Sequence, residues 1–300
     1  MAKQELVLKS NDGYELSLAV FAAKNPKATI MFVHGMEEYK ERYDAFASFL
    51  QSKGYNVVTS DMRGHGKNAP KLSHIANKKG DQLIIEDQKC ILSYIEENFK
   101  GLPVYLFAHS MGTIISRVLL QSESKRFSKV ALSGYVNPNP ASPVAVFLGN
   151  CVRTFKGGEK HSKLLTTLAM GNFSKAVKDR KTELDWLSYN EENVQKYIAD
   201  PLCGVEFTVG SYDALFHLLN NMGKAGKYKD VNESLPFLLI SGDGDPCTGF
   251  EKGRQASLKT LQKAGFKDIS VITLEHMRHE ILNEDKKEEV YQDILNFFDK

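Results

Sequence analysis

The chain contains a series of short apolar runs, and stretches with the periodicity of amphipathic helices separate them. The runs occupy residues 28–35, 55–61, 103–110, 127–134, 236–243 and 268–275. Because most of them are rich in Val, Ile and Leu without polar alternation, we expect strands that are covered on both faces. This order of elements predicts an α/β fold, in which a mostly parallel central sheet is flanked by helices.

The N-terminal region follows a different pattern, since apolar and polar residues alternate over residues 4–23 around the turn signal Asn11-Asp12-Gly13. We expect a β-hairpin here, ahead of the parallel strands. With the two hairpin strands counted first, the runs at 127–134 and 236–243 become the sixth and seventh strands.

A long interval separates the sixth strand from the seventh, because about 100 residues (135–234) lie between them. A crossover between parallel strands needs only about a dozen residues, and long loops without secondary structure are rare in compact domains. We therefore predict that this interval is an inserted helical cap and that residues 1–134 and 235–300 form the core. The segments with helical periodicity in the cap are 143–154, 163–171, 191–198 and 212–222.

Composition excludes several classes of protein. The formal net charge is +2 at pH 7, which gives no reason to expect nucleic acid as a partner. The N-terminus has no apolar leader, and no run of about 18 apolar residues is available to cross a membrane. The cysteines lack the spacing of a zinc site or a disulfide framework. They are Cys90, Cys151, Cys203 and Cys247. We therefore expect a cytoplasmic protein with reduced cysteines.

The stretch LFAHSMGTI, residues 106–114, places Ser110 between an apolar strand and a helix. A nucleophile elbow reads G-x-S-x-G, and residues 108–112 read A-H-S-M-G. The elbow turn needs small residues two positions before and two after the serine, and Ala108 and Gly112 are both small. Taken alone, the motif leaves two roles open for Ser110, which are a catalytic nucleophile and a cap of the following helix.

A serine nucleophile needs a base and a carboxylate, and on this type of fold they follow in the order Ser, Asp or Glu, His. The seventh strand runs into Asp243 and Asp245, and the last strand runs into His276 and His279. All of these residues follow the carboxyl ends of predicted strands, where the sites of open α/β sheets gather. The residues alone leave both carboxylates and both histidines open as candidates.

The oxyanion that forms on attack needs hydrogen-bond donors, and two backbone N–H groups are candidates. His34-Gly35-Met36 ends the run at 28–35, where an HG-type motif supplies one donor. We assign the N–H groups of Met36 and Met111 to this oxyanion hole. The ring of His34 is interpreted as a brace of the loop, and the side chain of Met111 as part of the core.

Two other motifs fit poorly. Residues 64–69 satisfy G-x-G-x-x-A, but Pro70 follows directly and no helical pattern begins there, so a dinucleotide site is not supported. His279-Glu280 begins an H-E-x-x-H pattern whose fifth residue is Asn283, so a zinc site is not supported either. We expect neither a metal nor an organic cofactor.

Together these motifs resemble those of an α/β-hydrolase of the monoacylglycerol lipase and lysophospholipase family, also described as serine-aminopeptidase-like. Residues 33–68, from VHGMEE to RGHGKN, are similar to the family's segment from the oxyanion loop through the next strand. AHSMG is similar to its nucleophile motif apart from Ala108, and residues 185–204 resemble a stretch in the cap of bacterial members. The similarity covers nearly the whole chain.

The resemblance implies which of the open candidates are used. The family's acid lies in a G-x-x-D pattern, which falls on Asp245, and its histidine lies in an R-H-E stretch, which falls on His279. Asp243 is then assigned to the turn, and His276 to a strand end or the surface. The implied catalytic residues are Ser110, Asp245 and His279.

The activity implied by the resemblance is hydrolysis of carboxylic esters through a Ser-His-Asp triad and an acyl-enzyme. We expect a small-molecule ester or lipid such as a monoacylglycerol or a lysophospholipid, because residues 142–152 and 212–219 are apolar enough to line an acyl tunnel. The same segments also fit ordinary core helices of the cap. A transient contact of the cap with a membrane surface stays open, as does the oligomeric state.

Two other functions stay open. An aminopeptidase similar to proline iminopeptidase uses the same triad and needs an acidic group in the cap to hold the amine of its substrate. Candidates for that group are Glu192, Asp200 and Glu206. A non-catalytic binding protein on the same fold would be favoured by loss of a triad member, and no member is missing.

Overall fold

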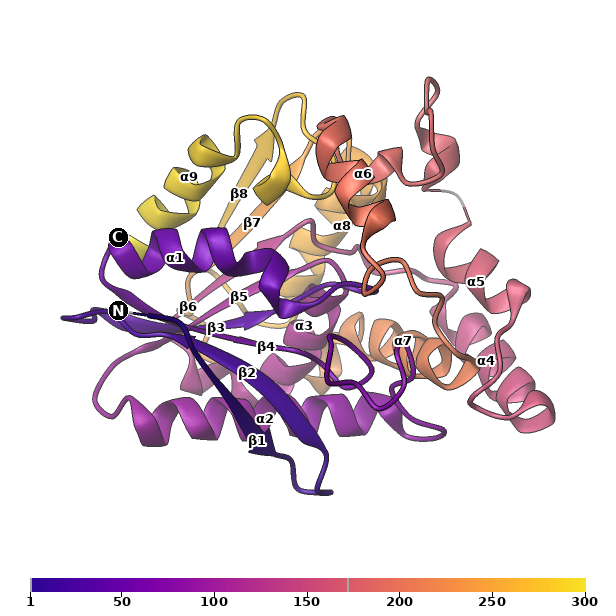
Figure 1. Ribbon diagram of the computed structural model, residues 1–300, viewed down its shortest axis with the longest axis horizontal. Helices are drawn as coiled ribbons and strands as arrows, with labels where there is room; N and C mark the ends of the chain where they lie inside the picture. Colours follow the sequence, from indigo (N-terminus) through magenta and orange to yellow (C-terminus); the bar gives the residue numbers. More distant parts are fainter. Residues whose placement is uncertain (1, 172) are drawn as a thin grey trace.

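The computed structural model describes residues 2–171 and 173–300. Within these residues the strands form one eight-stranded sheet in the order β1-β2-β4-β3-β5-β6-β7-β8. The strands are β1 (Gln4–Lys9), β2 (Glu15–Phe21), β3 (Ala28–Val33), β4 (Tyr55–Ser60), β5 (Val104–His109), β6 (Lys129–Ser133), β7 (Phe237–Gly242) and β8 (Ile269–Leu274). Figure 1 shows the sheet at the centre of the molecule, with helices on both sides of it.

The pairing of the strands confirms the predicted sheet. β1 and β2 form the N-terminal hairpin, and β2 pairs antiparallel with β4. All pairings from β4 to β8 are parallel. β3, β4 and β7 are buried at every position, which explains why their sequences lack the alternation of a half-exposed strand.

Helices follow most of the strands, as the periodicity predicts. Those outside the predicted cap are α1 (Asp44–Ser52), α2 (Gly80–Asn98), α3 (Met111–Glu123), α8 (Phe250–Lys263) and α9 (Lys287–Asp299). The patterns did not predict α8, which lies between β7 and β8. Its buried residues include only one large apolar side chain, that of Leu261, so its apolar stripe is too weak to be recognised from the sequence.

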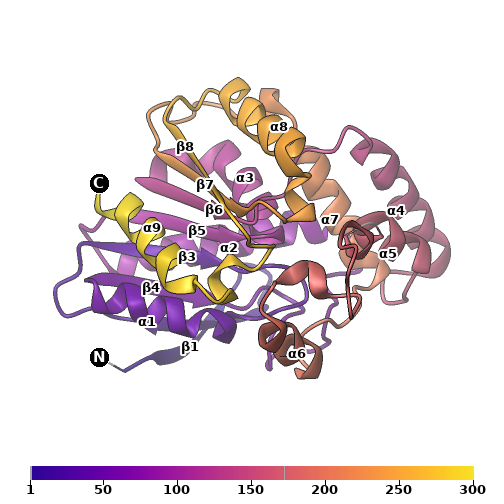
Figure 2. The same cartoon turned by 90° about the horizontal axis from the view of Figure 1, so that it is seen from above.

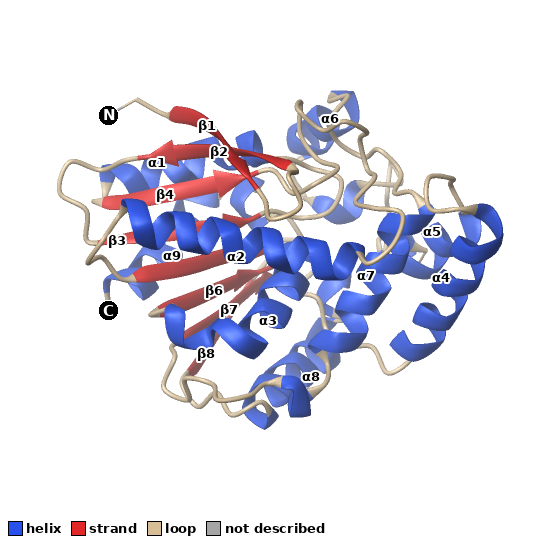
Figure 3. Cartoon of the chain, turned by 90° about the horizontal axis from the view of Figure 1, so that it is seen from below, coloured by secondary structure: helices blue, strands red, loops and turns tan. Residues whose placement is uncertain are grey.

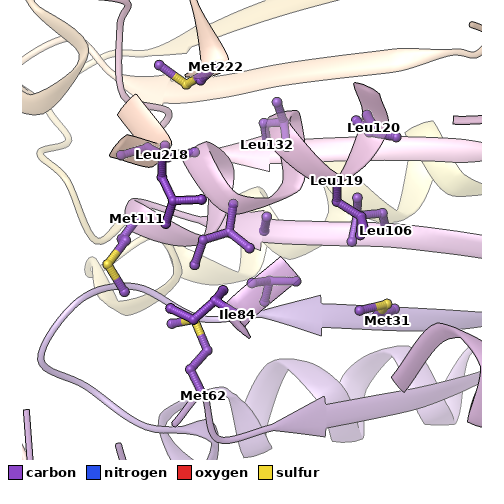
Figure 4. Close-up of a cluster of buried hydrophobic side chains, with 14 of the residues drawn as sticks. Met31, Met62, Ile84, Leu106, Met111, Leu119, Leu120, Leu132, Leu218 and Met222 are labelled. Carbon is purple, nitrogen blue, oxygen red and sulfur yellow. The ribbon is translucent and has the colours of Figure 1, made fainter. Parts of the chain in front are cut away.

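The two faces of the sheet have separate cores, because successive side chains of a strand point in opposite directions. In β5, Leu106 belongs to the cluster that includes α2 and α3, whereas Phe107 belongs to the cluster that includes α1 and α9. Figure 2 shows α1 and α9 in front of the sheet, and Figure 3 shows α2 and α3 in front of its other face. In Figure 4, Leu106 and Leu132 of neighbouring strands lie beside Leu119 of α3.

The segment between β6 and β7 is helical, as predicted. Its α-helices are α4 (Ser142–Lys156), α5 (Lys163–Met170), α6 (Glu191–Ala199) and α7 (Val209–Met222). Figures 1 and 3 show α4, α5 and α7 grouped beyond the carboxyl ends of the parallel strands. Tyr212 and Leu218 of α7 are buried in the same cluster as α2 and α3, so this segment is packed onto the core. Its division from the core at residues 135 and 234 stays a prediction.

The G-x-G-x-x-A motif at residues 64–69 is not followed by a helix. The described residues 61–79 form turns, bends and irregular loop, so the motif lacks the helix that a dinucleotide site requires.

None of the described helices combines the length and the apolar character that crossing a membrane requires.

We predict that Phe107→Ala lowers the free energy of unfolding by about 3–5 kcal/mol, because it leaves a cavity in a closely packed core. The ring contacts Phe32 and Phe46, with centroids 4.8 and 5.3 Å away. Urea unfolding followed by circular dichroism measures the change. Phe155→Ala is the matched control, since that ring is 88% exposed. An equal loss of stability in the two variants would contradict the packing of β5.

Candidate active site

Ser110 occupies the sharp turn between β5 and α3, as the sequence predicts. Its φ of 51° and ψ of −122° lie outside the regions that residues other than glycine favour. Hydrogen bonds hold this turn. The N–H of Ser110 donates to Ser133 O at 3.1 Å, and the N–H and hydroxyl of Thr113 donate to Ser110 O at 2.8 and 2.7 Å. Strain of this kind persists only where the surrounding structure overrides it, and it is typical of functional turns.

The two small residues of the motif differ in what they tolerate. A Cβ on Gly112 would lie 2.2 Å from Val33 O and 2.6 Å from His34 O, so only glycine fits between α3 and the end of β3. Ala108 is fully buried in the core cluster that includes α3, where its methyl group is packed. The departure from G-x-S-x-G therefore falls at the position that can accept a methyl group.

His279 and Asp245 are buried and hydrogen-bonded to each other. Nδ1 of His279 lies 3.0 Å from Oδ2 of Asp245, and the two side chains are 2% and 0% exposed. The other carboxylate oxygen of Asp245 accepts the N–H of Cys247 at 2.8 Å, which fixes the carboxylate in the turn after β7. Burial lowers the pKa of His279, but the charge and the hydrogen bond of Asp245, together with the charges of Glu280 and Glu38, outweigh burial and raise this pKa above its usual value.

The other two candidates from the sequence lie elsewhere. Asp243 is exposed, and its N–H donates to Leu274 O at 2.9 Å within the turn. His276 is exposed, and its ring stacks on that of Tyr189 with the centroids 4.1 Å apart. The structure therefore brings Asp245 and His279 together and leaves Asp243 and His276 at the surface.

Ser110 and His279 line one cavity of about 300 Å³. Much of its wall is apolar, and most of the apolar residues belong to the segment between β6 and β7. Those from this segment are Val136, Ala145, Leu168, Ala169, Met170, Phe173, Leu184, Trp186, Leu187, Leu215, Phe216 and Leu219. Ile114 of α3 adds to them. The helices that follow β6 therefore form one side of the space into which the serine opens.

Met36 and Met111 also line this cavity. Met111 is the first residue of α3, so its N–H has no acceptor within the helix. Across residues 2–171 and 173–300, neither the N–H of Met36 nor that of Met111 donates a hydrogen bond. The side chain of Met111 packs into the core cluster that Figure 4 shows. Two unpaired donors therefore remain beside the serine.

The ring of His34 braces the loop after β3, as the sequence interpretation expects. Its Nε2 accepts the N–H of Met62 at 3.0 Å, and its Nδ1 lies 2.7 Å from Gly35 O. Because Nε2 is an acceptor, Nδ1 carries the proton and donates to the carbonyl oxygen, which corresponds to the neutral imidazole.

An ion-pair network behind the cavity was not predicted. Arg42 donates to both carboxylate oxygens of Glu280 at 2.6 and 2.7 Å, and to Glu38 at 2.8 Å. Glu38 in turn accepts the N–H of Gly35 at 2.5 Å, so the network holds the loop that carries Met36. Arg42 and Glu280 are 238 positions apart, and no local spacing could reveal such a pair.

Two rings close to His279 were also missed. Trp186 lies 5.0 Å from it between centroids, and His109 lies 4.7 Å from it. Burial, with the charge of His279 adding to it, lowers the pKa of His109 to about 4, so this second imidazole is neutral. Trp186 belongs to the stretch 185–204 that resembles the family's cap. This resemblance was the one feature of the sequence that could have indicated a place for Trp186 at the site.

The carboxylates at the cavity are not the ones considered for an aminopeptidase. Glu192 and Glu206 are exposed, and Asp200 accepts the hydroxyl of Tyr39 at 2.6 Å. The carboxylates that line the cavity are those of Glu37, Glu38 and Glu280. The sequence interpretation singled out none of these three as an acidic group of the site.

Asp245, Cys247 and His279 also place three ligand-type atoms within 4.8 Å of one another. Burial, with the charge of Asp245 adding to it, holds the pKa of the Cys247 thiol well above its usual value. A protonated thiol is a poor metal ligand, and the other two side chains already bond each other. The group fits a hydrogen-bonded Asp–His pair better than a metal site.

Comparison with known proteins decides the family. Residues 24–286 match the model of a family described as serine aminopeptidase, S33. The chain belongs to this family. Among S33-like relatives, rat monoglyceride lipase is 26% identical over 226 residues, which cover 73% of the chain and 66% of that enzyme. The match thus spans just under two thirds of the length of the rat enzyme.

Two bacterial proteins are also similar to this S33 family member. Phospholipase YtpA of Bacillus subtilis is 25% identical over 280 residues, which cover 93% of the chain and 97% of that protein. The structure of a thermostable carboxyl esterase from Bacillus coagulans, in complex with glycerol, has a TM-score of 0.89 at 23% identity and covers 100% and 98% of the two chains. This likeness shows that the α/β-hydrolase fold is shared.

We predict that Gly112→Ala lowers the free energy of unfolding by about 1–3 kcal/mol, since its Cβ would overlap the Val33 carbonyl and force α3 away from β3. The same displacement would slow labelling of Ser110 by a fluorophosphonate probe. Urea unfolding and the labelling rate measure the two effects. Gly226→Ala is the control, because nothing lies within 4 Å of the added Cβ there. Two variants of equal stability would show that the contact is not tight.

Proposed function

We propose that the protein is a serine hydrolase of carboxylic esters, with Ser110 as nucleophile, His279 as base and Asp245 as the residue that orients His279. One observation carries this proposal. Ser110, on its strained turn, shares a largely apolar cavity with His279, whose ring is hydrogen-bonded to the buried Asp245. The names of its relatives, a monoglyceride lipase and a phospholipase, support the same reaction class.

The reaction follows from the roles of these groups. His279 takes the proton of the Ser110 hydroxyl through Nε2, because its Nδ1 is occupied by Asp245. The serine oxygen attacks the ester carbonyl, and the N–H groups of Met36 and Met111 stabilise the oxyanion. His279 then returns the proton to the leaving alcohol. Water, activated by the same imidazole, releases the acid from the acyl-enzyme.

The cavity supports a proposal for the substrate class. Its apolar wall and its volume of about 300 Å³ suit a single acyl chain, since small-molecule sites are mostly apolar with few polar groups. A monoacylglycerol or a lysophospholipid has one such chain and one polar head. We propose substrates of this kind, and we propose that residues 135–234 act as the cap that encloses the chain.

Exposed apolar side chains of the cap support the transient membrane contact that the sequence left open. Val144, Phe147 and Phe155 of α4 are 60%, 66% and 88% exposed, and Leu164 and Leu168 of α5 are 51% and 46% exposed. Leu168 also lines the cavity, so one of these exposed apolar side chains reaches the proposed acyl site. An exposed patch of this kind is typical of surfaces that meet lipid or protein.

The first experiment compares Ser110→Ala with the unaltered protein on nitrophenyl esters of increasing chain length, a monoacylglycerol, a lysophospholipid and aminoacyl anilides. We expect ester turnover to fall about 1,000-fold or more, because the nucleophile is lost. Ser116→Ala is the matched control. It removes a buried hydroxyl of α3, the helix that follows Ser110, and this hydroxyl has no hydrogen-bond partner in the described residues.

Each outcome of this panel has a clear meaning. Turnover that rises with chain length and disappears in Ser110→Ala supports the acyl site and the nucleophile. Cleavage of anilides in preference to esters would assign the aminopeptidase function instead. Equal rates in the two proteins on every substrate would refute the serine mechanism, and no turnover of any substrate would favour the non-catalytic binding protein.

The pH profile tests the His279–Asp245 pair. The base must be neutral, and its pKa is raised above the ordinary 6.5, so kcat/KM should fall as the pH drops through a midpoint above that value. In Asp245→Asn we expect the midpoint to move to lower pH and the rate to fall about 10,000-fold. Asp243→Asn, at the exposed neighbouring carboxylate, should leave the midpoint unchanged. A shift of equal size in both variants would disprove the assignment of Asp245.

A further inference from the structure

The loop that carries His279 is bonded to the segment between β6 and β7 through both of its neighbours in the chain. Directly after it, the N–H of Glu280 donates to Leu187 O at 2.7 Å. Directly before it, the guanidinium of Arg278 donates to Asp185 O at 2.6 Å. Figure 2 shows the yellow chain after β8 next to the stretch that leads into α6. The place of His279 therefore depends on partners 93 positions earlier in the chain.

Glu284 joins the same two stretches through its carboxylate, and this residue is only 3% exposed. Its Oε1 accepts the N–H groups of Arg278 and Tyr189 at 2.8 and 3.0 Å. Its Oε2 accepts the hydroxyl of Ser188 at 2.7 Å and the N–H of Asn190 at 3.1 Å. One carboxylate thus bonds the residue that precedes the imidazole and three consecutive residues of the other stretch.

These bonds are strong enough to hold the two stretches together. A buried carboxylate needs several donors to offset the cost of its burial, and hydrogen bonds to an ionised oxygen are roughly twice as strong as bonds between neutral groups. The donors that face Glu284 meet this need. If the carboxylate were removed, buried N–H groups of both stretches would lose their acceptor, which favours a looser arrangement of the loop.

The imidazole has little room in which to move if its loop stays in place. The ring of Trp186, which lies between Asp185 and Leu187 in the chain, is 5.0 Å from that of His279 between centroids. Gly134 is also close, because a Cβ there would lie 3.1 Å from Cε1 of His279. The position of the ring is therefore set by how the loop is docked.

We propose that Glu284 is a positioning residue, whose carboxylate docks the loop of His279 onto residues 188–190 and so keeps the imidazole in place at Asp245. This inference rests on the proposed function. Glu284 is not among the described residues that line the cavity, so it acts through His279 and not on the substrate.

Glu284→Gln tests this role, because the amide has nearly the same shape but turns an N–H₂ group toward N–H donors. We expect kcat on a medium-chain nitrophenyl ester to fall by about 10- to 100-fold, since a small misplacement of a catalytic group has an effect of this size. KM should change by less than about twofold, because the wall of the cavity is unaltered. Circular dichroism checks that the variant is folded.

Two further variants accompany it. Asp285→Asn is the matched control, since it makes the same change of charge at the exposed neighbouring residue and should leave kcat unchanged. Ser188→Ala removes one donor to Glu284 and leaves the carboxylate itself. It should lower kcat in the same direction but by less, and it keeps the inference testable if Glu284→Gln does not fold.

A second readout does not depend on activity. Trp186 is the only tryptophan in the sequence, and a protonated imidazole quenches the fluorescence of a nearby indole. Emission as a function of pH therefore reports the charge of His279, with a midpoint above the ordinary 6.5 in the unaltered protein. In Glu284→Gln the hold of Asp245 on the ring weakens, so the midpoint should move to lower pH. The charged and titratable groups that face His279 are Asp245, Glu280, Glu38 and His109.

The outcomes separate this inference from the proposed function. An unchanged kcat and an unchanged fluorescence midpoint in Glu284→Gln would overturn the positioning role and leave the ester hydrolase intact. A fall in kcat without any shift of the midpoint would also overturn it, because the imidazole would then have kept its place. If the unaltered protein hydrolyses no ester, the proposed function fails, and the fluorescence midpoint still decides whether Glu284 positions His279.

Discussion

The close approach of α3 to the end of β3 is the constraint on which the site depends. Because Gly112 has no side chain, the first turn of α3 lies directly against the Val33 and His34 carbonyl groups. This contact brings the N–H of Met111 to the same side of the cavity as the loop that carries Met36. It also holds Ser110 in a backbone conformation that an isolated chain would rarely adopt. The absence of a side chain at Gly112 thus helps to set the positions of Ser110 and of the Met111 N–H, whereas Glu38 and Arg42 hold the loop that carries Met36.

The charges around the cavity are organised in three groups with different partners. Asp245 pairs with His279 and makes the imidazole a stronger base. Arg42 pairs with Glu38 and Glu280 and holds the loop after β3. Glu37 forms no salt bridge among the residues that the structure describes.

Sequence patterns identified most elements correctly, for physical reasons that also explain the exceptions. Buried parallel strands need apolar residues on both faces, so β3 and β7 were evident from composition alone. α8 was missed because a helix that buries little apolar surface leaves almost no periodic signal. The departure at Ala108 could be judged only from packing, since the sequence shows a methyl group and the structure shows that it fits.

The sequence by itself indicated where the strands end and that Ser110 lies between a strand and a helix. It also indicated two candidate aspartates after β7 and two candidate histidines after β8. These features depend on local propensity and on the rule that parallel strands share one carboxyl edge. The choice between Asp243 and Asp245 followed from resemblance, and the spatial reason is burial, because Asp245 is enclosed with His279 whereas Asp243 faces water. The Arg42–Glu280 pair and the isolation of Glu37 arise from contacts between segments far apart in the chain. Such contacts depend on how the elements pack, and no local pattern of residues encodes them.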